Sequence, residues 1–572
     1  MLVFAPPGQV APIADSHKTW THPIVPDSAV PVDKEGESYT TVTYIFIVYN
    51  MQNGREQLLQ TVSQNPTWDI VIIGGGATGL GIALDATLRG FKTLLLEQHD
   101  FTKGTSSKST KLVHGGVRYL AQGDVFLVIE ALRERGLMLR NAPHLVKDQT
   151  FIIPNYAWWR GPFYTIGLTM YDLLAGKWSF GRSYFIGRKK VIGRIPTIRQ
   201  SGLKSGVVYH DGQFDDSRLA VHIVRSILAN GGTALNYVAA KSLIKENGQI
   251  VGVCAEDQET GTQYRIAAKA VVNATGVFVN DIIKMDQPEA PNLIRPSQGI
   301  HFVVDKEFLP GNDALMIPKT DDGRVLFAVP WHNKIVVGTT DTAIATPSLE
   351  PQALEEEIDF ILRTASRYLE KPMRREDVRS VFVGLRPLAA PRSEGDKKTR
   401  EISRNHKIIV SDSGLITITG GKWTTYRKMA QDVVDKTIAL GKLPKADCTT
   451  ETFRIHGYKE NVDHSNPLYV YGSDVPELER LCAERPEWKE PLHDRLPYMK
   501  GEVVWAVRFE LARTVEDVLA RRLRALLLDA RAAVDSAPFV AEILAGELQQ
   551  DDAWKKRQVE EFTELAKAYI LC

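Results

Sequence analysis

The sequence has few cysteines, and they follow no pattern that binds a metal. Its 572 residues include four, Cys254, Cys448, Cys482 and Cys572, which stand far apart and form no CxxC pair. That spacing argues against a disulfide framework and a cysteine zinc site, so we expect no metal centre. Four isolated thiols fit a chain that folds in a reducing compartment.

An excess of charge of one sign is missing as well. Lys and Arg total 70 and Asp and Glu total 69, which leaves a formal net charge of +1. This balance gives no whole-chain field that would attract nucleic acid, so nucleic acid is not an expected partner. The length is enough for two to four domains and a sizeable core.

Long hydrophobic runs and targeting signals are also lacking. The longest early apolar run, Tyr44 to Tyr49, is much too short to span a bilayer. The N-terminus lacks a basic start, so it predicts neither a signal peptide nor an Arg-rich transit peptide. Residues 1–60 are rich in Pro, Asp, Ser and Thr, and we expect a disordered or loosely attached extension. A short edge strand at 41–49 is the alternative.

The first strong pattern in the chain starts at Trp68. DIVIIGGG predicts an apolar strand that runs into glycines, and ATGLGIALDATLRG predicts a helix of small apolar residues. FKTLLLE then predicts a second strand, which ends in an acid. The three segments together form a βαβ unit.

Gly74, Gly76 and Gly79 form a GxGxxG pattern between this strand and this helix. The first glycine allows a tight turn, the second lets a pyrophosphate approach the backbone, and the third lets helix and strand pack closely. The helix N-terminus offers unpaired N–H groups and a partial positive charge to phosphates. Glu97 ends the second strand, eighteen residues after Gly79, where a carboxylate can bind a ribose diol. The pattern predicts a dinucleotide site.

Two features favour FAD over NAD as the dinucleotide. Strand patterns that end in glycine return at 267–276 and 415–421, after long insertions. Simple nicotinamide dehydrogenases usually have an uninterrupted binding domain, and flavoenzymes reduced by NADH commonly carry a second GxGxxG, which this sequence lacks. We therefore expect one tightly held FAD and an electron partner other than a nicotinamide.

The stretch GTSSKSTKLVHGGVRYLAQG, residues 104–123, follows Glu97 closely and is crowded with hydroxyl groups. It should lie along the far half of the cofactor, where hydroxyls can hydrogen-bond the pyrophosphate and the polar edge of a flavin. The residues expected to do so are Thr105, Ser106, Ser107 and Thr110. We expect the backbone of His114, Gly115 and Gly116 beside the flavin ring. An ordinary Ser/Thr-rich loop is the alternative.

The later chain predicts two further parts. Short β-rich runs with turns such as His332-Asn333 indicate an antiparallel domain that interrupts the parallel sheet. After about Asp447 the pattern becomes helical, and 514–530 predicts a helix that Thr514 and Asp517 begin at capping-box spacing. Its apolar face leaves out Arg521 and Arg524.

Five segments resemble a known family in the same order and spacing. The stretch from Asp69 to Leu120, with VVNATGVFVND, GLRPL, ITGGKWTTYRK and ARTVEDVLARR, is similar to FAD-dependent glycerol-3-phosphate dehydrogenases. The resemblance spans about residues 66–535 and implies an α/β fold. A Rossmann-like FAD-binding domain would be interrupted by an antiparallel β-rich substrate domain, as in D-amino-acid oxidase, with a C-terminal α-helical cap.

The expected boundaries follow from the motifs and the resemblance together. The FAD-binding domain takes 66–150, 205–290 and 405–440, and the substrate domain takes 151–204 and 291–404. The helical domain takes 445–572. The resemblance also implies the reaction: sn-glycerol 3-phosphate gives a hydride from C2 to flavin N5 and becomes dihydroxyacetone phosphate, and the electrons pass to membrane quinone.

The same resemblance implies which residues hold the dianionic substrate, since a phosphate site gathers Arg and Lys. The substrate-binding residues would be Arg118 and Tyr119 of HGGVRYL, Arg386 of GLRPL, Arg404 of ISRNH, and Lys422 and Thr424 of GGKWTT. Arg118 and Arg386 would also be catalytic, because cations stabilise negative charge that develops on O2. Further cofactor contacts would come from Ala274, Gly276, Gly421 and Lys422. For Arg404, nearby Arg400 is the alternative.

A base must take the hydroxyl proton when C2 loses its hydride. His301 in PSQGIHF falls at the family's histidine position and can accept a proton near neutral pH. His114 is the rival, although its position suggests cofactor contact. The sequence departs from its relatives here, because GIH follows Ser297-Gln298 where a Lys often stands.

A membrane contact is expected from residues 173–210, which contain no Asp or Glu. This span holds eight cations, from Lys177 to Lys204, and the aromatic segment YAWWRGPFYTIGLTMY precedes it. Aromatic anchors beside basic residues are typical of an interfacial segment on anionic lipid. A core helix with a solvated hairpin is the alternative. We expect a cytoplasmic protein, peripheral on the inner face of the cytoplasmic membrane, and a homodimer is a further partner to test.

Three other functions compete with this hypothesis. An oxidase of the same fold would pass electrons to O2, and no residue in the sequence decides between the two acceptors. A flavin-binding sensor without turnover would not need the cations Arg118, Arg386 and Lys422. An amino-acid oxidase would lack the HGGVRYL and GGKWTTYR cations together.

Overall fold

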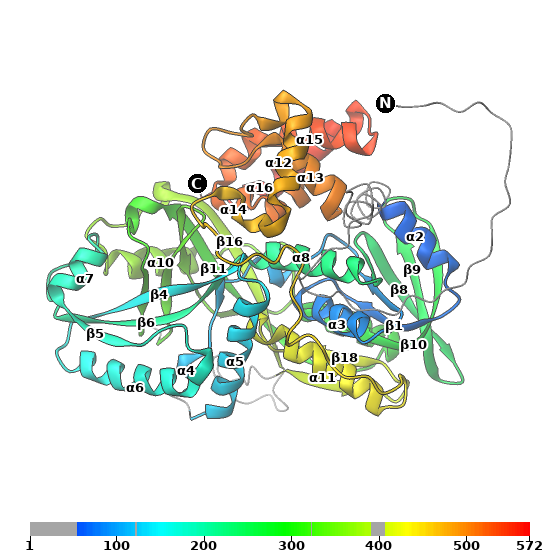
Figure 1. Ribbon diagram of the computed structural model, residues 1–572, viewed down its shortest axis with the longest axis horizontal. Coiled ribbons are helices and arrows are strands. Elements are labelled where there is room, and N and C mark those ends of the chain that lie inside the picture. Colours follow the sequence, from blue (N-terminus) through cyan, green and yellow to red (C-terminus); the bar gives the residue numbers. More distant parts are fainter. Residues whose placement is uncertain (1–53, 121–122, 322, 390–405, 572) are drawn as a thin grey trace, which may run out of the picture. The chain divides into compact units, whose positions relative to one another are not determined.

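The computed structural model describes residues 54–120, 123–321, 323–389 and 406–571. Two β-sheets and a group of C-terminal helices make up this part of the chain (Figure 1). None of the helices within the described ranges is both long and apolar enough to cross a membrane. The predicted extension lies outside the described residues up to residue 53.

The first sheet is mostly parallel and carries the βαβ unit. Its main path runs β17-β18-β10-β1-β2-β7, and β8 and β9 extend it beside β10. The strands are β1 (Trp68–Ile73), β2 (Thr93–Leu96), β7 (Thr233–Leu235), β8 (Val238–Glu246), β9 (Gln249–Asp257), β10 (Gln263–Asn273), β17 (Lys407–Val410) and β18 (Ile416–Thr419). Residues Ile70, Val71 and Ile72 of β1 are fully buried, as expected for a parallel strand covered on both faces.

Besides α2 (Gly54–Gln64), the helices that pack on this sheet include α3 (Ala77–Leu88), α8 (Asp216–Ala229), α9 (Val279–Asp286) and α11 (Tyr426–Ala439). The small residues of α3 let α11 approach it closely, because a Cβ atom on Gly81 would lie 2.9 Å from the ring of Tyr426. The helix that opens the dinucleotide site is thereby packed against the segment that follows the GGKWTT motif.

The second sheet has ten strands and is almost wholly antiparallel. Its main path runs β15-β11-β14-β13-β12-β4-β6-β3, with β16 beside β11 and β5 beside β6. The strands are β3 (Leu112–Val113), β4 (Val146–Asn155), β5 (Tyr184–Gly187), β6 (Ser205–Phe214), β11 (Ile294–Asp305), β12 (Ala314–Ile317), β13 (Leu326–Trp331), β14 (Lys334–Gly338), β15 (Thr342–Ala343) and β16 (Val378–Ala389). His332 and Asn333 turn β13 into β14 with positive φ angles of 45° and 59°, as the sequence predicted.

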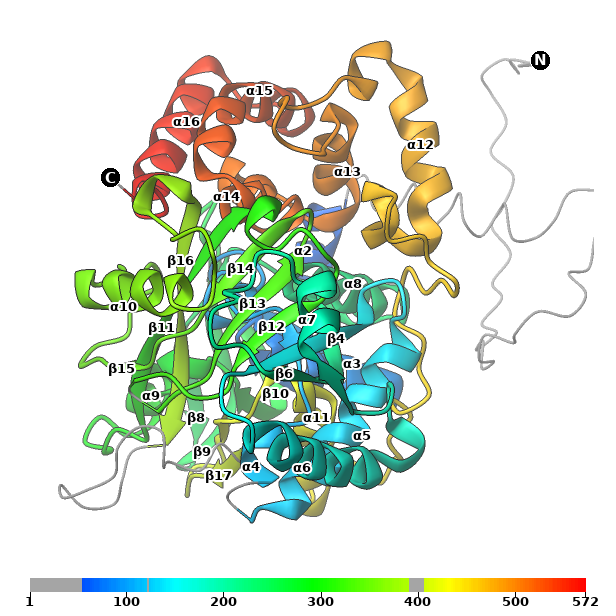
Figure 2. The ribbon, with the colours of Figure 1, turned by 90° about the vertical axis from the view of Figure 1, so that its left-hand side faces the viewer.

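The remaining helices of the middle part surround this sheet. They are α4 (Val117–Leu120), α5 (Val125–Asn141), α6 (Arg160–Ala175), α7 (Arg188–Arg194) and α10 (Glu355–Ser366). Helices α6 and α7 cover opposite faces, because Leu168 of α6 packs with Phe151 and Ile153, whereas Val191 of α7 packs with Ile152. Figure 2 shows α6 and α7 separated by β6.

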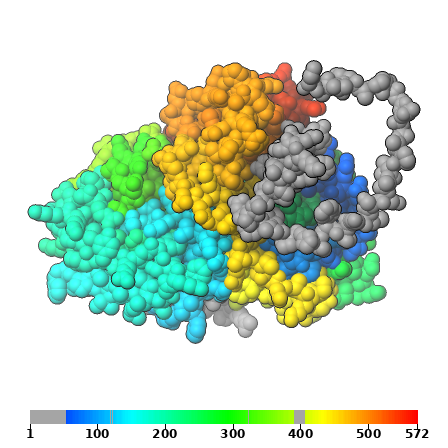
Figure 3. Space-filling view, viewed as in Figure 1, coloured from blue at the N-terminus to red at the C-terminus, as the bar shows by residue number. Residues whose placement is uncertain are grey.

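The C-terminal helices pack together on one side of the two sheets (Figures 1 and 2). They are α12 (Val475–Glu484), α13 (Lys500–Glu510), a π-helix (Asp517–Arg522), α14 (Ala525–Leu528), α15 (Ala530–Leu548) and α16 (Asp552–Lys567). In Figure 3 the gold chain that leads into them runs down between the cyan and blue segments. There the amide of Ile455 donates to the carbonyl of Asn141 at 3.0 Å.

The expected single helix over 514–530 was wrong, although its capping box forms. Thr514 Oγ1 donates to Asp517 at 2.7 Å, but the chain then winds into the π-helix and α14. Arg521 and Arg524 are buried, with 3% and 1% exposure. The reason is that acids from the first sheet and α8 pair with these arginines, so tertiary ion pairs override the local apolar pattern.

Two domain boundaries also need correction. Helix α2 (Gly54–Gln64) belongs to the folded body, because buried Arg55 pairs with Asp257 at 2.7 Å, so the extension cannot reach residue 60. Strands β3 and β6 and the start of β4 lie in the second sheet, although their residues were assigned to the FAD-binding domain. The ten-residue ladder between β4 and β6 decides this placement, and the predicted architecture of two sheets and a helical cap is otherwise confirmed.

Candidate active site

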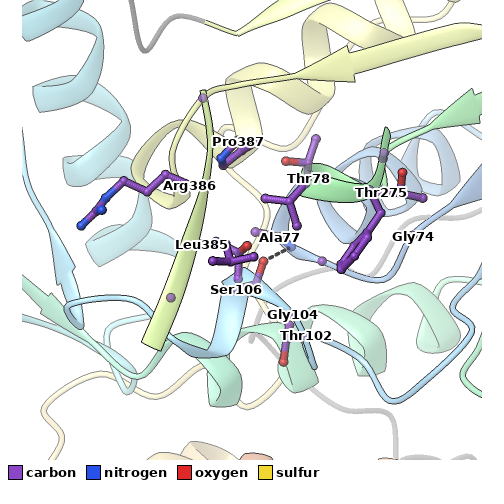
Figure 4. Close-up of a pocket in the computed structure, with 18 of the residues that line it drawn as sticks. Gly74, Ala77, Thr78, Thr102, Gly104, Ser106, Thr275, Leu385, Arg386 and Pro387 are labelled. Carbon is purple, nitrogen blue, oxygen red and sulfur yellow. Dashed lines mark hydrogen bonds between the residues drawn. The ribbon is translucent and has the colours of Figure 1, made fainter. Parts of the chain in front are cut away.

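A cavity of about 390 Å³ lies where the carboxyl ends of β1, β10 and β18 meet strands β11 and β16 of the second sheet. Parallel strands direct their carboxyl ends, and the loops that follow them, toward one edge of a sheet, where α/β folds bind ligands. The cavity therefore has a wall from each sheet, and Figure 4 shows several of the residues that line it.

The dinucleotide turn forms one end of this cavity. Gly74 has a φ angle of 110°, and a Cβ atom there would lie 2.8 Å from the carbonyl oxygen of Ala274. A Cβ atom on Gly79 would lie 1.9 Å from the carbonyl oxygen of Gly74, so only glycine allows α3 to start so close to β1. Gly75 must also lack a side chain, because a Cβ atom there would lie 2.8 Å from the Cβ of Glu97.

Glu97 is fixed beside this turn by two backbone amides. Gly75 donates to its Oε2 at 2.7 Å, and His99 donates to its Oε1 at 2.9 Å. Burial raises the pKa of this carboxyl, while the two amides act in the opposite direction. Each oxygen keeps a further lone pair, which suits a carboxylate that accepts hydrogen bonds from a ribose.

Ser106 links the hydroxyl-rich loop to the helix that binds phosphate. Its Oγ accepts the amide of Ala77 at 3.0 Å, the dashed line in Figure 4. Its carbonyl oxygen accepts the indole N–H of Trp423 at 2.8 Å. The loop, the first turn of α3 and the GGKWTT segment therefore meet at one residue, and Trp423 is a contact that the sequence analysis missed.

The residues around this end fit FAD. Glycines 74 to 76 leave backbone open where a side chain would fill the space, and α3 directs its first turn to the same place. Glu97 stands at one side, and small or hydroxyl residues continue along the cavity toward His301. An elongated dinucleotide can therefore lie between the turn and the second sheet.

Most of the predicted site residues line this one cavity. They are Gly74, Gly76, Glu97, Thr105, Ser106, Thr110, His114, Ala274, Gly276, His301, Arg386, Gly421, Lys422 and Thr424. Arg118 and Tyr119 belong to α4, but their side chains lie outside the described part of the structure, as does all of Arg404. Their roles remain predictions.

Four predicted cofactor contacts lie outside the lining. Ser107 is buried behind the lining. Gly115 faces α5 and α6, because its Cβ would lie 2.3 Å from the hydroxyl of Tyr171, and its amide donates to Asp211 at 3.2 Å. Gly116 is buried and is not part of the lining, so this pair serves packing behind His114. Gly79 likewise acts by close packing, without lining the cavity.

His301 lies on β11 and is held on several sides. Its Nε2 is 2.9 Å from Thr110 Oγ1, and its ring stacks on Phe382 with 4.8 Å between centroids. A Cβ atom on Gly338 would lie 2.3 Å from the ring, so this glycine makes room for it. Burial, with Arg386 and Lys111 nearby, lowers the pKa of His301 well below its ordinary value, which keeps the ring neutral.

Arg386 lies on β16, and its side chain extends to the opposite side of that strand from Ala77 and Thr78 (Figure 4). Its guanidinium donates to Asp341 at 3.2 Å and to the carbonyl of Thr340 at 2.9 Å. These contacts orient a cation at the end of the cavity that the second sheet forms. The buried Nζ of Lys422 adds a second cation, just before the short helix Trp423–Thr425.

Lys111 is a further candidate that local patterns did not reveal, although it lies in the hydroxyl-rich stretch. This lysine is fully buried and pairs with Asp216 at 2.7 Å. Burial, then repulsion from Arg524, lowers its pKa to about 7. Its only sequence signal was its position in the hydroxyl-rich stretch, because the paired acid lies 105 residues later.

Comparison with known proteins agrees with this architecture. The model of a family described as FAD dependent oxidoreductase matches residues 69–427. A second model, the C-terminal domain of alpha-glycerophosphate oxidase, matches residues 415–555. The two models together cover both sheets and the helical cap as far as the start of α16.

Named relatives give a finer comparison. A probable mitochondrial glycerol-3-phosphate dehydrogenase of Caenorhabditis elegans is 39% identical over 538 residues, which are 88% of this chain and 74% of that protein. The mitochondrial glycerol-3-phosphate dehydrogenase of Schizosaccharomyces pombe is 36% identical, over 90% of this chain and 89% of its own length. The chain belongs to the FAD-dependent glycerol-3-phosphate dehydrogenase family.

Solved structures show the same family fold. The glycerol-3-phosphate dehydrogenase of Bacillus halodurans, complexed with FAD, is 30% identical and has a TM-score of 0.75 over 91% of this chain and 98% of that one. The L-alpha-glycerophosphate oxidase of Mycoplasma pneumoniae shares the fold, with a TM-score of 0.52 at 13% identity. The expected cofactor, FAD, is confirmed for this glycerol-3-phosphate dehydrogenase family member.

Proposed function

We propose that this chain oxidises sn-glycerol 3-phosphate to dihydroxyacetone phosphate and passes the electrons to membrane quinone. The observation that carries the proposal is a single cavity in which the dinucleotide turn, His301, Arg386 and Lys422 all take part. Relatives named glycerol-3-phosphate dehydrogenase support the choice of substrate. When bound, FAD supplies the oxidising power by accepting a hydride.

His301 is the proposed base for the C2 hydroxyl proton. A neutral imidazole can accept a proton, and the lowered pKa of this group keeps it neutral at physiological pH. Its Nδ1 is buried and has no hydrogen-bond partner in the described part of the chain, while Nε2 faces Thr110. A substrate hydroxyl can therefore compete for a ring nitrogen whose orientation is already fixed.

Arg386 and Lys422 are the proposed phosphate and O2 contacts. Arg386 lies 22% exposed, so it is desolvated enough to bind an anion firmly yet can be reached from the cavity. Thr424, Arg118, Tyr119 and Arg404 join them by family motif. Charge-assisted hydrogen bonds from these groups would stabilise both the phosphate and the negative charge that develops on O2.

Membrane attachment is the part of the proposal that concerns the electron acceptor. Helix α6 exposes an apolar stripe at helical spacing, formed by Trp159, Phe163, Ile166, Met170 and Leu173. Phe126 of neighbouring α5 is 88% exposed and adds to it. We call these six residues the α6 face, and α6 lies at the lower left in Figures 1 and 3. An exposed apolar face of this kind fits the interfacial region of a bilayer.

The part of the basic span that forms α7 does not share this face. Arg188, Lys189 and Lys190 open α7, which covers the other face of the second sheet. The aromatic segment and the cations of α7 therefore lie on different sides of the second sheet. We propose that the α6 face enters the bilayer and that the cations of α7 stay in solvent.

The membrane itself and the oligomeric state are further parts of the proposal. Attachment to the inner face of the cytoplasmic membrane is the expectation from the sequence, and a mitochondrial membrane is the second candidate because the curated relatives are named mitochondrial. Fractionation of cells with a marker for each membrane decides between the two. A homodimer would be seen by light scattering of the detergent-free protein.

One experiment tests the reaction. The purified protein is mixed anaerobically with glycerol 3-phosphate, and the visible absorption of the flavin is followed in a stopped-flow instrument. Rapid bleaching is expected, followed by faster reoxidation with a soluble quinone than with air. Reoxidation by O2 alone would favour the oxidase, and a flavin that does not bleach would leave only the sensor.

A further inference from the structure

Asp216, the first residue of α8, hydrogen-bonds the loop that contains Thr110. It is fully buried. Its Oδ2 accepts the amide and the hydroxyl of Ser109, at 3.1 and 2.6 Å, and the Nζ of Lys111 at 2.7 Å. The two residues on either side of Thr110 are thus bound to one carboxylate oxygen.

The other oxygen of Asp216 binds the C-terminal helical part. Arg524 donates to Oδ1 at 2.8 Å and, through the same nitrogen, to the carbonyl of Ser107 at 2.9 Å. Lys111 also donates to that carbonyl, at 2.7 Å. The loop from Ser107 to Lys111 is therefore closed on itself and fastened to two distant segments, and its backbone has little freedom.

The loop held by Asp216 contacts His301 directly and also contacts the ring on which His301 stacks. Thr110, at the centre of the loop, contacts Nε2 of His301. The Nζ of Lys111 lies 5.1 Å from the ring centre of Phe382, on whose face His301 stacks. Lys111 itself has a left-handed φ of 63°, a conformation that a lysine keeps only where its surroundings hold it.

We infer that Asp216 is a positioning residue for the reaction, which holds Thr110 where it orients the ring of His301 toward the substrate. Asp216 does not line the cavity, and the lining residue that it hydrogen-bonds is Ser109, so we take it to act through the loop. The inference rests on the proposed function, because it takes His301 as the base.

The expected consequence is a loss in the chemical step with binding preserved. Asp216→Asn keeps the volume but removes the charge that holds Lys111 and Ser109, so Thr110 shifts. A placed general base contributes about 10²–10⁴ in rate, and we expect flavin reduction by glycerol 3-phosphate to slow by about tenfold to a hundredfold. The KM for glycerol 3-phosphate and the flavin-to-protein ratio should change by less than about threefold, since the groups proposed to bind phosphate and FAD lie elsewhere.

A double-mutant cycle separates positioning from general damage. Thr110→Val removes the contact to His301 directly, and the double variant with Asp216→Asn should be no slower than Thr110→Val alone. If the double variant instead slows flavin reduction by the product of the two single effects, the inference is overturned. Such a result would show that Asp216 acts on the rate by a route other than Thr110. Ser109→Ala, which keeps every buried charge, gives the same cycle if Asp216→Asn fails to fold.

Asp215 provides the matched control. It is the neighbouring acid, is also buried, and binds His332 at 2.9 Å and the amide of Arg218. It also lies 3.5 Å from Nε of Arg524, but within the described part of the chain it makes no hydrogen bond to residues 107–111. Asp215→Asn should lower the melting temperature and leave the rate of flavin reduction within about twofold of the parent. An equal loss of rate in both variants would mean that buried charge in general, and not the loop, controls the rate.

The same variants distinguish failure of the proposed function from failure of the positioning role. If Thr110→Val and His301→Gln both bleach the flavin as fast as the parent does, His301 is not the base and the proposed function fails. If those two variants are slow while Asp216→Asn is not, the proposed function stands and the positioning role is wrong. Melting temperatures and flavin content of each variant check that the folded holoenzyme is compared throughout.

Discussion

His301 and Arg386 face the same side of the second sheet. In the ladder between β11 and β16, His301 pairs with Phe382 and Ser297 pairs with Arg386, so both functional side chains stand two pleats apart on one face. Gly384, between them on β16, passes so close to the hydroxyl-rich loop that a Cβ atom there would lie 2.4 Å from the carbonyl of Lys108. The proposed base and anion clamp are therefore set by one strand pair, against which the cofactor loop packs.

Replacing Arg386 by Ala should weaken substrate binding while FAD stays bound. Hydrogen bonds to a charged group are worth about 1.5–3 kcal/mol each, so kcat/KM for glycerol 3-phosphate should fall by about 10- to 150-fold, mainly through KM. Steady-state assays with a soluble acceptor measure this. Arg379→Ala is the control on the same strand, because Arg379 pairs with Asp305 outside the cavity, and it should keep normal kinetics. Equal kinetics in the two variants would remove Arg386 from the site.

Replacing Glu97 by Arg should empty the protein of FAD. The substitution puts a cation where two amides donate and where a ribose would seek an acceptor, so the turn at Gly75 loses its partner. We expect the flavin-to-protein ratio after gel filtration to drop more than about tenfold, since two hydrogen bonds to a charged acceptor are lost. Glu246→Arg, at an exposed position on β8, should stay yellow. A yellow Glu97→Arg protein would contradict the assignment.

Acid should destabilise the protein through buried neutral histidines. Burial lowers the pKa of His144 to about 3, and burial also lowers the pKa of neighbouring His222 well below its ordinary value. The unfolded chain binds protons at these histidines below about pH 6.5, whereas the folded chain does not. Stability is therefore fully present above pH 6.5 and falls as pH drops below it, by up to about 1.4 kcal/mol per pH unit for each histidine.

The variant His144→Gln tests this sign. Its melting temperature at neutral pH should be lower than that of the parent, because the packing of two buried rings is disturbed. Between about pH 6.5 and 4.5, however, its melting temperature should fall less steeply than the parent's. Parallel curves over that interval would mean that His144 is protonated in the folded protein.

Polar substitutions on the α6 face should release the protein from membranes. Phe163, Ile166 and Leu173 are 63%, 66% and 76% exposed, so serine at these positions costs little folding stability but removes the apolar area that would enter the bilayer. Flotation with vesicles of mixed neutral and anionic lipid measures the bound fraction. Binding by the parent should persist at about 1 M salt, where the Debye length is only about 3 Å.

Helix α7 supplies the control for that experiment. Arg188→Glu, Lys189→Glu and Lys190→Glu together change the charge by six units, from +3 to −3, on a helix at the other sheet face. This triple variant should float as the parent does. If it stays in solution while the α6 variant floats, the basic span is the docking surface after all.

Local patterns predicted the dinucleotide end of the site well. Gly74, Gly76, Gly79 and Glu97 lie within one βαβ unit, so their spacing in the chain fixes their spacing in space. The family motifs also brought His301 and Arg386 to the same cavity. The meeting of Thr110 with His301 could not be predicted, because 191 residues separate them and different segments supply them.

Two features that local patterns did not predict have a shared physical cause. The helical pattern alone placed Arg521 and Arg524 outside the apolar face, which predicts that they are exposed to solvent. In the structure, acids far away in the sequence pair with them. The basic and aromatic segments adjoin in the sequence, but the chain passes from one face of the sheet to the other between α6 and α7. Pairing across the fold leaves no periodic signal in either partner.

The buried arginines of the C-terminal part also determine when the ion pairs of the N-terminal part can form during synthesis. Asp100 can pair with Arg522 only after another 422 residues have been synthesised, and Asp216 can pair with Arg524 only after another 308. At roughly 5–20 residues per second of synthesis, these acids stay without their partners for tens of seconds after they leave the ribosome. Cofactor capture should therefore be a late event in biogenesis, and chains that stop short of residue 524 should accumulate as colourless, protease-sensitive fragments.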